Sequence, residues 1–542
     1  MPTFATDSGI ALTDVRVSNF RSLENIEVEL GDLTVLIGSN NAGKTSFLDA
    51  MFAAIGAGKR TLTSDDVRLE AGEAIAPKNR AVIIDVRIRP VCEQGRLLDS
   101  FPLGSFWTAL WGNLLMTDPY EGTESISFRT TLSWSVARGD YAIERKALKE
   151  WRGFKDWFAT PCQENQLGAP LLEPIALHYI DAKRDLDEDF RKQGSFWRRM
   201  TDELGLGDAD ITELENALIE INQGIVEKSD VLKHLKKSLS DLQVVVSADS
   251  ADIDIAPVAG KLRDLSKGVT VSFSTAGAQS FPLSRHGMGT RSLASLLVFR
   301  AFASWKNLRA ENGGEQVHSI LALEEPESHL HPQAQRTLFS HIKEIKGQRI
   351  VSTHSPYFTG QADLEDLRLF IKRKGKTSVT KLDLSILQNS DDKRKLRETV
   401  IESRGDLLFA RAVVFFEGQT EEQALPVWAQ RFWGASIHEL GFSFVRVNGT
   451  DYFPFIWLAK ALDIPWYVFA DGEPQPVGRL EQCLKKASLP EAKYCSNIFI
   501  LPEGRNFETQ LISEGYLAEA EKALNEIHEC ENALDRFIDR NH

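Results

Sequence analysis

Four short apolar runs in this chain end at a glycine loop or at acidic residues, a pattern typical of parallel strands in an α/β sheet. The runs span Thr34–Ile37, Ser319–Leu323, Val413–Phe416 and Val468–Ala470. In the same order, they are followed by a loop with two glycines, Glu324, Glu417 and Asp471. Open α/β sheets bind ligands at the carboxyl ends of their strands. We therefore expect an α/β protein with a ligand site in each half of the chain.

The glycine loop, Gly38–Thr45, reads GSNNAGKT and matches the phosphate-loop pattern GxxxxGK[ST] between a strand and a helix. In such loops the backbone N–H groups and the positive end of the following helix bind phosphate oxygens. Lys44 would neutralise the β- and γ-phosphates, and Thr45 would ligate Mg²⁺. We expect ATP here, bound by Asn40, Gly43, Lys44, Thr45 and Ser46.

The acidic strand end at Glu324 supplies the second part of this site. Glu324 would hold the Mg²⁺ shell, and Glu325 would polarise the attacking water as a catalytic residue. His354 follows another apolar strand and would contact the γ-phosphate. A strand-end acid is otherwise a solvated group, and an isolated histidine more often caps a helix or packs in a core. The combination of motifs favours the functional interpretation.

The second acidic site comprises Glu417, Glu421, Asp471 and Glu473. Glu417 and Glu421 are four positions apart, so one helical turn would direct both carboxylates to the same side. Asp471 and Glu473 are two positions apart, which on a strand end gives one face. Mg²⁺ prefers oxygen ligands. We expect these carboxylates to bind one or two Mg²⁺ or Mn²⁺ ions for phosphodiester hydrolysis, with Glu417 and Asp471 catalytic.

Composition narrows the class of protein. The chain has 542 residues and a net charge of −14, which excludes a surface that binds nucleic acid everywhere but permits a local basic track. No run of about 18 apolar residues is present, so we expect no membrane span. Five scattered cysteines without paired spacing are typical of free thiols in a reducing cytoplasm.

Changes in periodicity suggest how the chain is organised. We expect one domain over residues 1–405 and a second over 408–542. From Asp208 to Leu242, apolar residues recur every three or four positions, which predicts an amphipathic helical pair within an insertion at about 190–250. That pair would serve either core packing or dimerisation. A helical, amphipathic tail is expected from Ser513 to His542.

The motifs of the first half resemble a known group of ATPases. The phosphate loop, Glu324-Glu325-Pro326-Glu327, the His-Leu-His-Pro at 329–332 and Thr353-His354-Ser355-Pro356 resemble the ABC-type ATPases of the RecF, structural-maintenance (SMC) and OLD (overcoming lysogenisation defect) group. In that group a signature segment closes the nucleotide site of a partner protomer. Residues 284–292 occupy the corresponding position here, with Ser284, Gly287 and Gly289 as the implied nucleotide contacts. The resemblance implies a homodimer or higher homo-oligomer.

The second half resembles the TOPRIM metal site of topoisomerases, primases and OLD nucleases. That family usually has Asp-x-Asp where this chain has Asp471-Gly472-Glu473, so the departure at Glu473 bears on metal preference and rate. OLD nucleases carry another acidic ligand where Glu508 stands. An ordinary carboxylate at a helix start, stabilised by the helix dipole, is the alternative for Glu508.

Together, the resemblances imply an ATP-regulated, metal-dependent DNA endonuclease, similar to the Gabija nuclease and to retron-associated effectors of anti-phage defence. The implied partners are DNA, a second copy, and a defence-system protein or a reverse transcriptase with its non-coding DNA–RNA. An alternative is an ATPase sensor or scaffold with a weakened TOPRIM half that acts only within a partner complex. A topoisomerase or primase is disfavoured, because neither a zinc pattern nor a second catalytic domain accompanies the motif. Candidate DNA tracks, each otherwise a solvated face, are Lys183-Arg184, Arg198-Arg199, Lys236-Lys237, Lys372–Lys376 and Lys393–Arg397.

Overall fold

The computed structural model of this chain describes most of both halves. The described residues are 8–56, 62–119, 121–180, 207–230, 316–328, 330–387, 389–401, 405–447, 451–519 and 521–522, with Phe4 and short pieces at 272–273, 281–282 and 296. Two compact units are distinguished, each discontinuous in sequence. Unit 1 is Met1–Arg21, Glu29–Leu33 and Thr45–Val351, and unit 2 is Ser22–Val28, Thr34–Lys44 and Ser352–His542.

A largely antiparallel sheet is built from the first third of the chain. Its order is β2-β1-β4-β6-β7-β8, with β5 paired to β6. The strands are β1 (Ile10–Phe20), β2 (Leu23–Glu29), β4 (Val82–Pro90), β5 (Met116–Thr117), β6 (Glu124–Ser135), β7 (Asp140–Leu148) and β8 (Cys162–Gln166). In β2 the alternating residues Ile26 and Val28 are buried, as their period of two predicts. The charged pair Arg129 and Asp85 joins β6 to β4 at 2.7 Å.

The sheet that carries the phosphate loop has the order β15-β14-β3-β13-β12-β9. Its strands are β3 (Leu33–Ile37), β9 (Ile175–Ile180), β12 (His318–Glu324), β13 (Gln348–Ser352), β14 (Leu367–Arg373) and β15 (Lys376–Lys381). Every residue of β3, β12 and β13 is buried, and the apolar run Ile320–Leu323 of β12 is typical of a strand covered on both faces. The pairs β12–β9 and β14–β3 are parallel, whereas β15 closes an antiparallel hairpin with β14. The helices α1 (Lys44–Ile55), α9 (Pro332–Lys343) and α10 (Pro356–Thr359) follow β3, β12 and β13.

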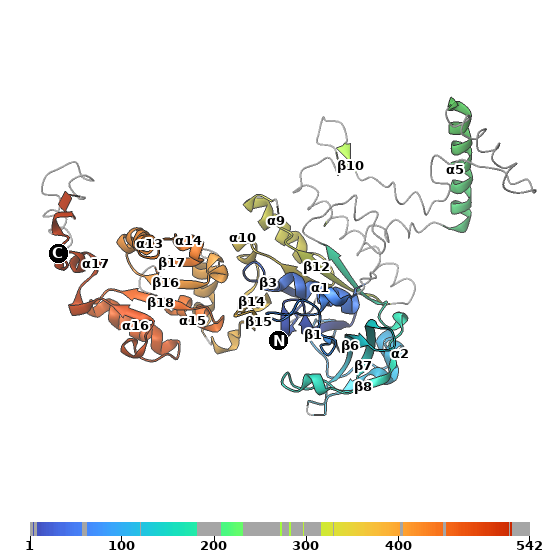
Figure 1. The fold of residues 1–542 in the computed structure, drawn as a ribbon, viewed down its shortest axis with the longest axis horizontal. Helices are drawn as coiled ribbons and strands as arrows, with labels where there is room; N and C mark the ends of the chain where they lie inside the picture. The colour runs from blue at the N-terminus through green and yellow to red at the C-terminus, as the bar shows by residue number, and fades with distance from the viewer. Residues whose placement is uncertain are drawn as a thin grey trace, which may run out of the picture. The chain divides into compact units, whose positions relative to one another are not determined.

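The C-terminal sheet is entirely parallel, with the order β17-β16-β18-β19. Its strands are β16 (Ala412–Phe416), β17 (Phe442–Arg446), β18 (Trp466–Ala470) and β19 (Ile498–Ile500). Its helices are α13 (Gln419–Trp433), α14 (Ile437–Leu440), α15 (Phe453–Ala461), α16 (Pro474–Lys486) and α17 (Phe507–Ser513). Figure 1 shows α13 and α14 on one side of the strands and α15 and α16 on the other. The chain reverses its direction of strand addition between β16 and β18, where α/β sheets place ligand sites.

The remaining described elements are one long helix, several short helices and turns, and one short pair of strands. They are α2 (Phe106–Trp111), α5 (Asp208–Lys228), α11 (Ser390–Lys395), a π-helix over Leu396–Ile401, the short pair β10 (Ser272–Phe273) and β11 (Phe281–Pro282), and 3₁₀ turns at Ser64–Asp66, Gly112–Leu114, Trp157–Ala159, Ala169–Leu171, Leu364–Asp366, Leu384–Ile386, Gly405–Phe409, Ala492–Tyr494 and Pro502–Gly504. The first part of the predicted helical pair is α5, and the second part lies outside the described residues. Of the described helices, none has the length and apolarity needed to cross a membrane. The boundary near 405–408 stays a prediction.

Candidate functional site

The backbone of the phosphate loop requires glycine at two positions. Gly38 has φ of +142°, and a Cβ there would lie 2.2 Å from the carbonyl oxygen of Phe370. Gly43 has φ of +108°, and its Cβ would lie 2.7 Å from the Leu23 side chain. These conformations are open to glycine and strained for other residues. The loop between β3 and α1 therefore has the shape that its sequence pattern predicts.

Lys44 is held close to this loop. Its side chain is 5% exposed, and Nζ donates to the carbonyl oxygens of Gly38 at 2.8 Å and Ser39 at 3.1 Å. Asn40 lies exposed on the loop, whereas Ser46 is half-buried in the first turn of α1. A lysine folded over the loop is positioned to meet phosphate oxygens on the same backbone.

Glu324 ends β12 and is held through both of its carboxylate oxygens. The hydroxyl of Thr45 donates to Oε1, and the hydroxyl of Tyr179 donates to Oε2. Tyr179 comes from β9, whose register places it beside Ala322 of β12. The structure thus brings the phosphate-loop threonine and the strand-end acid together, as a shared Mg²⁺ shell requires. Sequence reasoning missed Tyr179, because only the pairing of β9 with β12 brings it there.

Glu325, the predicted water-polarising residue, has a strained backbone. Its φ is +41°, a conformation that side-chain-bearing residues rarely adopt. Ser328 donates from its hydroxyl to Glu325 Oε2 at 3.3 Å. Such strain costs about 1–3 kcal/mol and clusters at functional sites. The outlier is consistent with the catalytic role expected for Glu325.

His354 follows the carboxyl end of β13 and is half-buried. Its ring centroid lies 6.5 Å from that of Phe409, and the next residue, Ser355, caps α10. The backbone N–H of Thr353 donates to the carbonyl of Leu36, the penultimate residue of β3. Within unit 2, His354 therefore belongs to a segment anchored to the strand that leads into the phosphate loop. The predicted signature residues Ser284, Gly287 and Gly289 lie outside the described residues.

The C-terminal carboxylates come together for a different reason than local spacing suggests. Glu417 precedes α13, whose N-cap is Gly418, while Glu421 lies in the first turn. The one-turn argument is therefore wrong for Glu417. The strand-face argument is also wrong, because β18 ends at Ala470 and Glu473 is the N-cap of α16. The pairing of β16 with β18 instead places Glu417 and Asp471 at adjacent strand ends.

The pKa of Asp471 reflects its burial and the acidic side chains around it. Burial, together with the negative charges of Glu421, Glu417, Glu508 and Glu473, raises the pKa of Asp471 to about 7. Its Oδ1 atom is buried and makes no hydrogen bond. The pKa values of Glu417 and Glu421 are also raised, in each case mainly by burial. Repulsion among these carboxylates would be relieved by a bound cation.

Neighbouring side chains hold three of the acids in place. Tyr452 donates from its hydroxyl to Glu417 Oε1 at 2.9 Å. Thr420 donates to Glu508 Oε1 at 2.6 Å, and the Asn506 amide donates to Glu473 Oε1 at 3.4 Å. Sequence reasoning missed Tyr452 and Asn506, since neither belongs to an acidic motif.

Two glycines shape the same site. A Cβ at Gly418 would lie 2.1 Å from Glu421 Oε2, so the Glu421 carboxylate occupies the space that a side chain would fill. A Cβ at Gly472 would lie 2.0 Å from the carbonyl oxygen of Leu501. Each glycine follows a predicted ligand, Glu417 or Asp471, and permits close packing around it.

The carboxylates form an open arrangement. Across the described ranges, no group of three or more His, Cys, Asp or Glu side chains is arranged so that it could hold a metal ion as it stands. Mg²⁺ is usually bound by one or two carboxylates and retains several waters. The oxygen donors and the buried, unbonded Asp471 oxygen fit such an ion.

Two of the predicted DNA-binding basic clusters, Lys372–Lys376 and Lys393–Arg397, contain residues that form ion pairs with acidic residues of this chain. Arg373, at the end of β14, pairs with Asp463, and Lys376 pairs with Glu24 at 2.9 Å. In the second track, Arg394 lies 2.7 Å from Asp391. These contacts favour a structural role for both tracks. Lys183-Arg184, Arg198-Arg199 and Lys236-Lys237 lie outside the described residues.

Comparisons with known families agree with this geometry. A family model described as AAA ATPase domain matches residues 11–93 and 171–359, together half of the chain. The chain belongs to the AAA ATPase domain family. A second model, the overcoming lysogenization defect protein-like TOPRIM domain, matches residues 408–472. This ATPase followed by an OLD-like TOPRIM domain confirms the α/β fold class and the resemblance to OLD proteins.

Individual relatives of this AAA ATPase domain protein include nucleases. An OLD nuclease from Thermus scotoductus (strain ATCC 700910 / SA-01) is 24% identical over 86% of this chain and 83% of its own. The endonuclease GajA from Bacillus cereus (strain HuB5-5) is 21% identical over 55% of this chain and 46% of its own. Among solved structures, an SMC head bound to the C-winged helix domain of ScpA covers 69% of this chain and 98% of its own, at 14% identity and a TM-score of 0.39.

Proposed function

We propose that this protein is an ATP-regulated, metal-dependent DNA endonuclease whose hydrolytic centre is the carboxylate group around Asp471. One observation carries the proposal: Asp471 has a buried, unbonded oxygen and a pKa raised to about 7 among four glutamates. At pH values above that pKa the carboxylates repel one another, and a bound cation would relieve this repulsion. The nuclease names of two relatives support the same activity.

Each acid has a part in the proposed reaction. Glu417 and Asp471 would hold the ion directly, because they stand at the adjacent ends of β16 and β18. Glu421 and Glu473 would complete the oxygen donors, with Glu508 approaching from α17. When bound, Mg²⁺ or Mn²⁺ would supply an activated water and stabilise the leaving oxygen of the phosphodiester.

The residues that donate hydrogen bonds to these carboxylates would position them as ligands. The Tyr452 hydroxyl directs one oxygen of Glu417, and the Thr420 hydroxyl directs one oxygen of Glu508. A hydrogen bond to a ligating carboxylate fixes its orientation and commonly matters 10- to 100-fold for metal affinity or activity. Tyr452 is therefore a positioning residue in this proposal.

The nucleotide site would regulate this centre. Lys44 and the loop backbone would bind the phosphates of ATP, Thr45 and Glu324 would share Mg²⁺, and Glu325 would polarise the attacking water. The contacts of Thr45 and Tyr179 with Glu324 support this assignment. His354 would meet the γ-phosphate, and Ser284, Gly287 and Gly289 of a second copy would close the site. A homodimer or higher homo-oligomer is thus part of the proposal, as are domains at 1–405 and 408–542.

Cleavage of supercoiled plasmid DNA with Mg²⁺ or Mn²⁺ tests the proposal. Glu417→Gln should reduce cleavage about 100-fold or more, since it removes one negative ligand. Glu422→Gln is the matched control, because Glu422 lies in the first turn of α13, the helix that Glu417 precedes, and pairs with Arg446 at 3.1 Å. Lys44→Ala should alter only the ATP dependence. If Glu417→Gln cuts as fast as the wild type, the nuclease assignment fails.

A second candidate is a scaffold or sensor whose TOPRIM half acts only within a partner complex. The glutamate at position 473 favours it, because a side chain longer by one methylene stands where the TOPRIM family usually has aspartate. The test is to assay the purified protein alone and with a defence-system partner. Binding of ATP and DNA without cleavage, followed by cleavage once the partner is added, would support the scaffold or sensor. In either case we propose a role in anti-phage defence, with a partner protein or a reverse transcriptase and its DNA–RNA as the associated component.

A further inference from the structure

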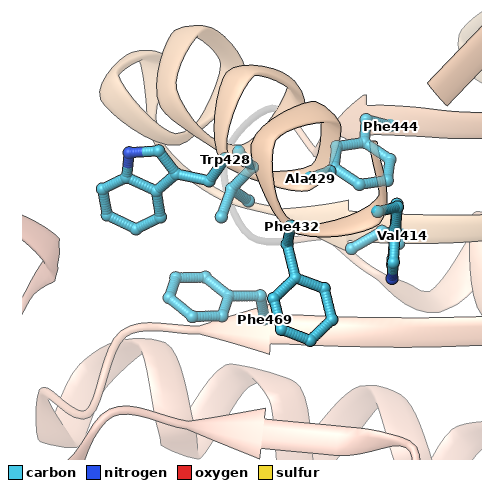
Figure 2. Close-up of a pocket in the computed structure, with 8 residues that line it drawn as sticks. Val414, Trp428, Ala429, Phe432, Phe444 and Phe469 are labelled. Atoms are coloured by element: carbon cyan, nitrogen blue, oxygen red, sulfur yellow. The ribbon is translucent and has the colours of Figure 1, made fainter. Parts of the chain in front are cut away.

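An apolar groove lies between the second half of α13 and the strands of the C-terminal sheet. Figure 2 shows Trp428 and Phe432 extending from α13 on the side of the groove where Phe469 of β18 lies. Phe432 is 86% exposed, and Trp428 is 43% exposed. The lining is apolar throughout, and the volume of about 340 Å³ falls within the range of pockets that hold small ligands. An exposed aromatic groove of this size indicates a binding surface.

Packed aromatic rings form one wall of this groove. Phe507, the first residue of α17, lies 5.4 Å from the Trp428 ring and 5.9 Å from the Phe469 ring. Phe469 in turn stacks on Phe499 of β19, with ring centroids 5.6 Å apart and an angle of 16° between the ring planes. Phe507 and Phe469 therefore lie between two exposed rings, Trp428 and Phe499, the second of which is 56% exposed. Rings held in this way lose little conformational freedom when a ligand stacks on them.

The groove begins next to the proposed metal site. Phe507 directly precedes Glu508, and α13 carries Glu421 in its first turn. At a rise of about 1.5 Å per residue, Trp428 lies about 10 Å and Phe432 about 16 Å beyond Glu421 along α13. These distances correspond to about three to five nucleotides at the spacing of about 3.4 Å between stacked bases. A strand with one phosphodiester at the carboxylates would therefore place its neighbouring bases in the groove.

A cation stands beside the exposed rings. Arg431 directly precedes Phe432 and is exposed. It lies one turn after Trp428, so the two side chains share a side of α13. A guanidinium binds phosphate oxygens and aromatic rings stack on bases, and proteins combine the two to bind single strands without reading their sequence. In a duplex the faces of the bases are already stacked within the double helix. The groove therefore fits unpaired bases rather than a duplex.

We propose that the groove at Trp428 and Phe432 binds unpaired bases of a DNA strand that is cleaved at the carboxylates around Asp471. The substrate is then single-stranded DNA or DNA with an unpaired stretch next to the cut, which negative supercoiling of a plasmid favours. This inference rests on the proposed nuclease function and adds the class of its substrate. Because the lining offers no polar side chain to the edges of the bases, binding has no strong sequence preference.

Fluorescence anisotropy of the full chain in EDTA measures DNA binding without cleavage. The probes are a labelled single strand of about 20 thymidines, which exceeds the distance to the groove, and a duplex of the same length. Phe432→Ala should weaken binding of the single strand about tenfold, the effect of losing one stacked base, and leave binding of the duplex unchanged. Phe432→Tyr keeps the ring and should bind as the wild type does. The control is Tyr494→Ala, which removes a ring that is 72% exposed and lies outside the groove lining.

The salt dependence of binding tests the part of Arg431. Arg431→Gln should lower the slope of log affinity against log salt concentration for the single strand by about 0.7, the value for one phosphate contact. Equal single-strand affinities of Phe432→Ala and Tyr494→Ala would overturn the proposal, as would a wild type that does not bind the single strand. If light scattering shows that Phe432→Ala dissociates a dimer while single-strand binding is unchanged, the groove belongs to a second copy and the proposal is wrong.

The plasmid assay with Glu417→Gln separates this inference from the proposed function. Cleavage that requires Glu417, together with unchanged single-strand binding by Phe432→Ala, would refute only the binding of bases in the groove. Single-strand binding that requires Phe432, in a protein that does not cleave DNA, would refute the nuclease and leave the groove as a single-strand binding site.

Discussion

Unit 1 contains a fully buried histidine whose protonation should set part of the acid sensitivity of this protein. His318, at the start of β12, is 0% exposed. Its Nδ1 lies 2.8 Å from the Ser8 hydroxyl, and its Nε2 lies 2.8 Å from Gln348 Oε1. Gln348 Oε1 also accepts from the backbone N–H of Leu12 at 2.7 Å. His318 is therefore neutral, with its proton on Nε2 and with Nδ1 accepting from Ser8.

The magnitude follows from the pKa of His318. Burial lowers it from 6.5 to about 4, although the Gln348 hydrogen bond opposes the shift. As the pH falls below 6.5, the unfolded chain gains a proton at this residue while the folded chain does not. Folding stability is thus complete above pH 6.5 and is lost progressively toward pH 4. A full shift of this size corresponds to about 3 kcal/mol, of which about 2 kcal/mol is lost between pH 7 and 5.

The assay compares urea unfolding of the wild type and His318→Gln at pH 7 and pH 5. Glutamine does not titrate, yet it can donate to Gln348 and accept from Ser8. The other titrating groups are common to both proteins and cancel in the difference. Between the two pH values, the wild type should lose about 2 kcal/mol more unfolding free energy than the variant. Equal losses would refute the neutral, buried state of His318.

Three further predictions concern the two sites. Asp471→Asn should raise the melting temperature of the metal-free protein at pH 8, where repulsion between the carboxylates is strongest. The same substitution should reduce the increase in melting temperature that Mn²⁺ causes, and an unchanged increase in thermal scans would contradict the metal assignment. Tyr179→Phe should slow ATP hydrolysis about tenfold, because the Glu324 carboxylate loses the hydrogen bond that Tyr179 donates. Hydrolysis is measured as phosphate release. The control is Tyr141→Phe, which removes a hydrogen bond to the Pro77 carbonyl. Gly418→Ala should displace Glu421 and weaken metal binding in calorimetry, whereas Gly478→Ala, which meets open space in α16, should not.

The sequence allowed prediction of the acids at strand ends, because an apolar run closed by a carboxylate is a local pattern. Glu324, Glu417 and Asp471 each follow such a run, and the structure places all three at the carboxyl ends of parallel strands. The fold class could be predicted from the same runs together with the phosphate loop.

The partners of these acids could not be predicted, because they come from distant parts of the chain. Tyr179 reaches Glu324 only because β9 pairs with β12, which lies more than a hundred residues later. Tyr452 reaches Glu417 from the N-cap of α15. Register and helix placement are set by packing across the whole sheet, which periodicity does not encode.

Glu473 is the residue at which this chain departs from the usual TOPRIM pattern, and the structure explains how the longer side chain is accommodated. Gly472 donates its N–H to the Arg505 carbonyl at 2.8 Å and packs against Leu501, so the loop after β18 is tied to the segment after β19. Pro474 then fixes the first turn of α16, which holds the backbone of Glu473 at the N-cap. The Asn506 amide, from the segment tied to Gly472, reaches the Glu473 carboxylate. Because the longer side chain is held at both its backbone and its carboxylate, glutamate at this position is compatible with an ordered metal ligand, as the proposed nuclease requires.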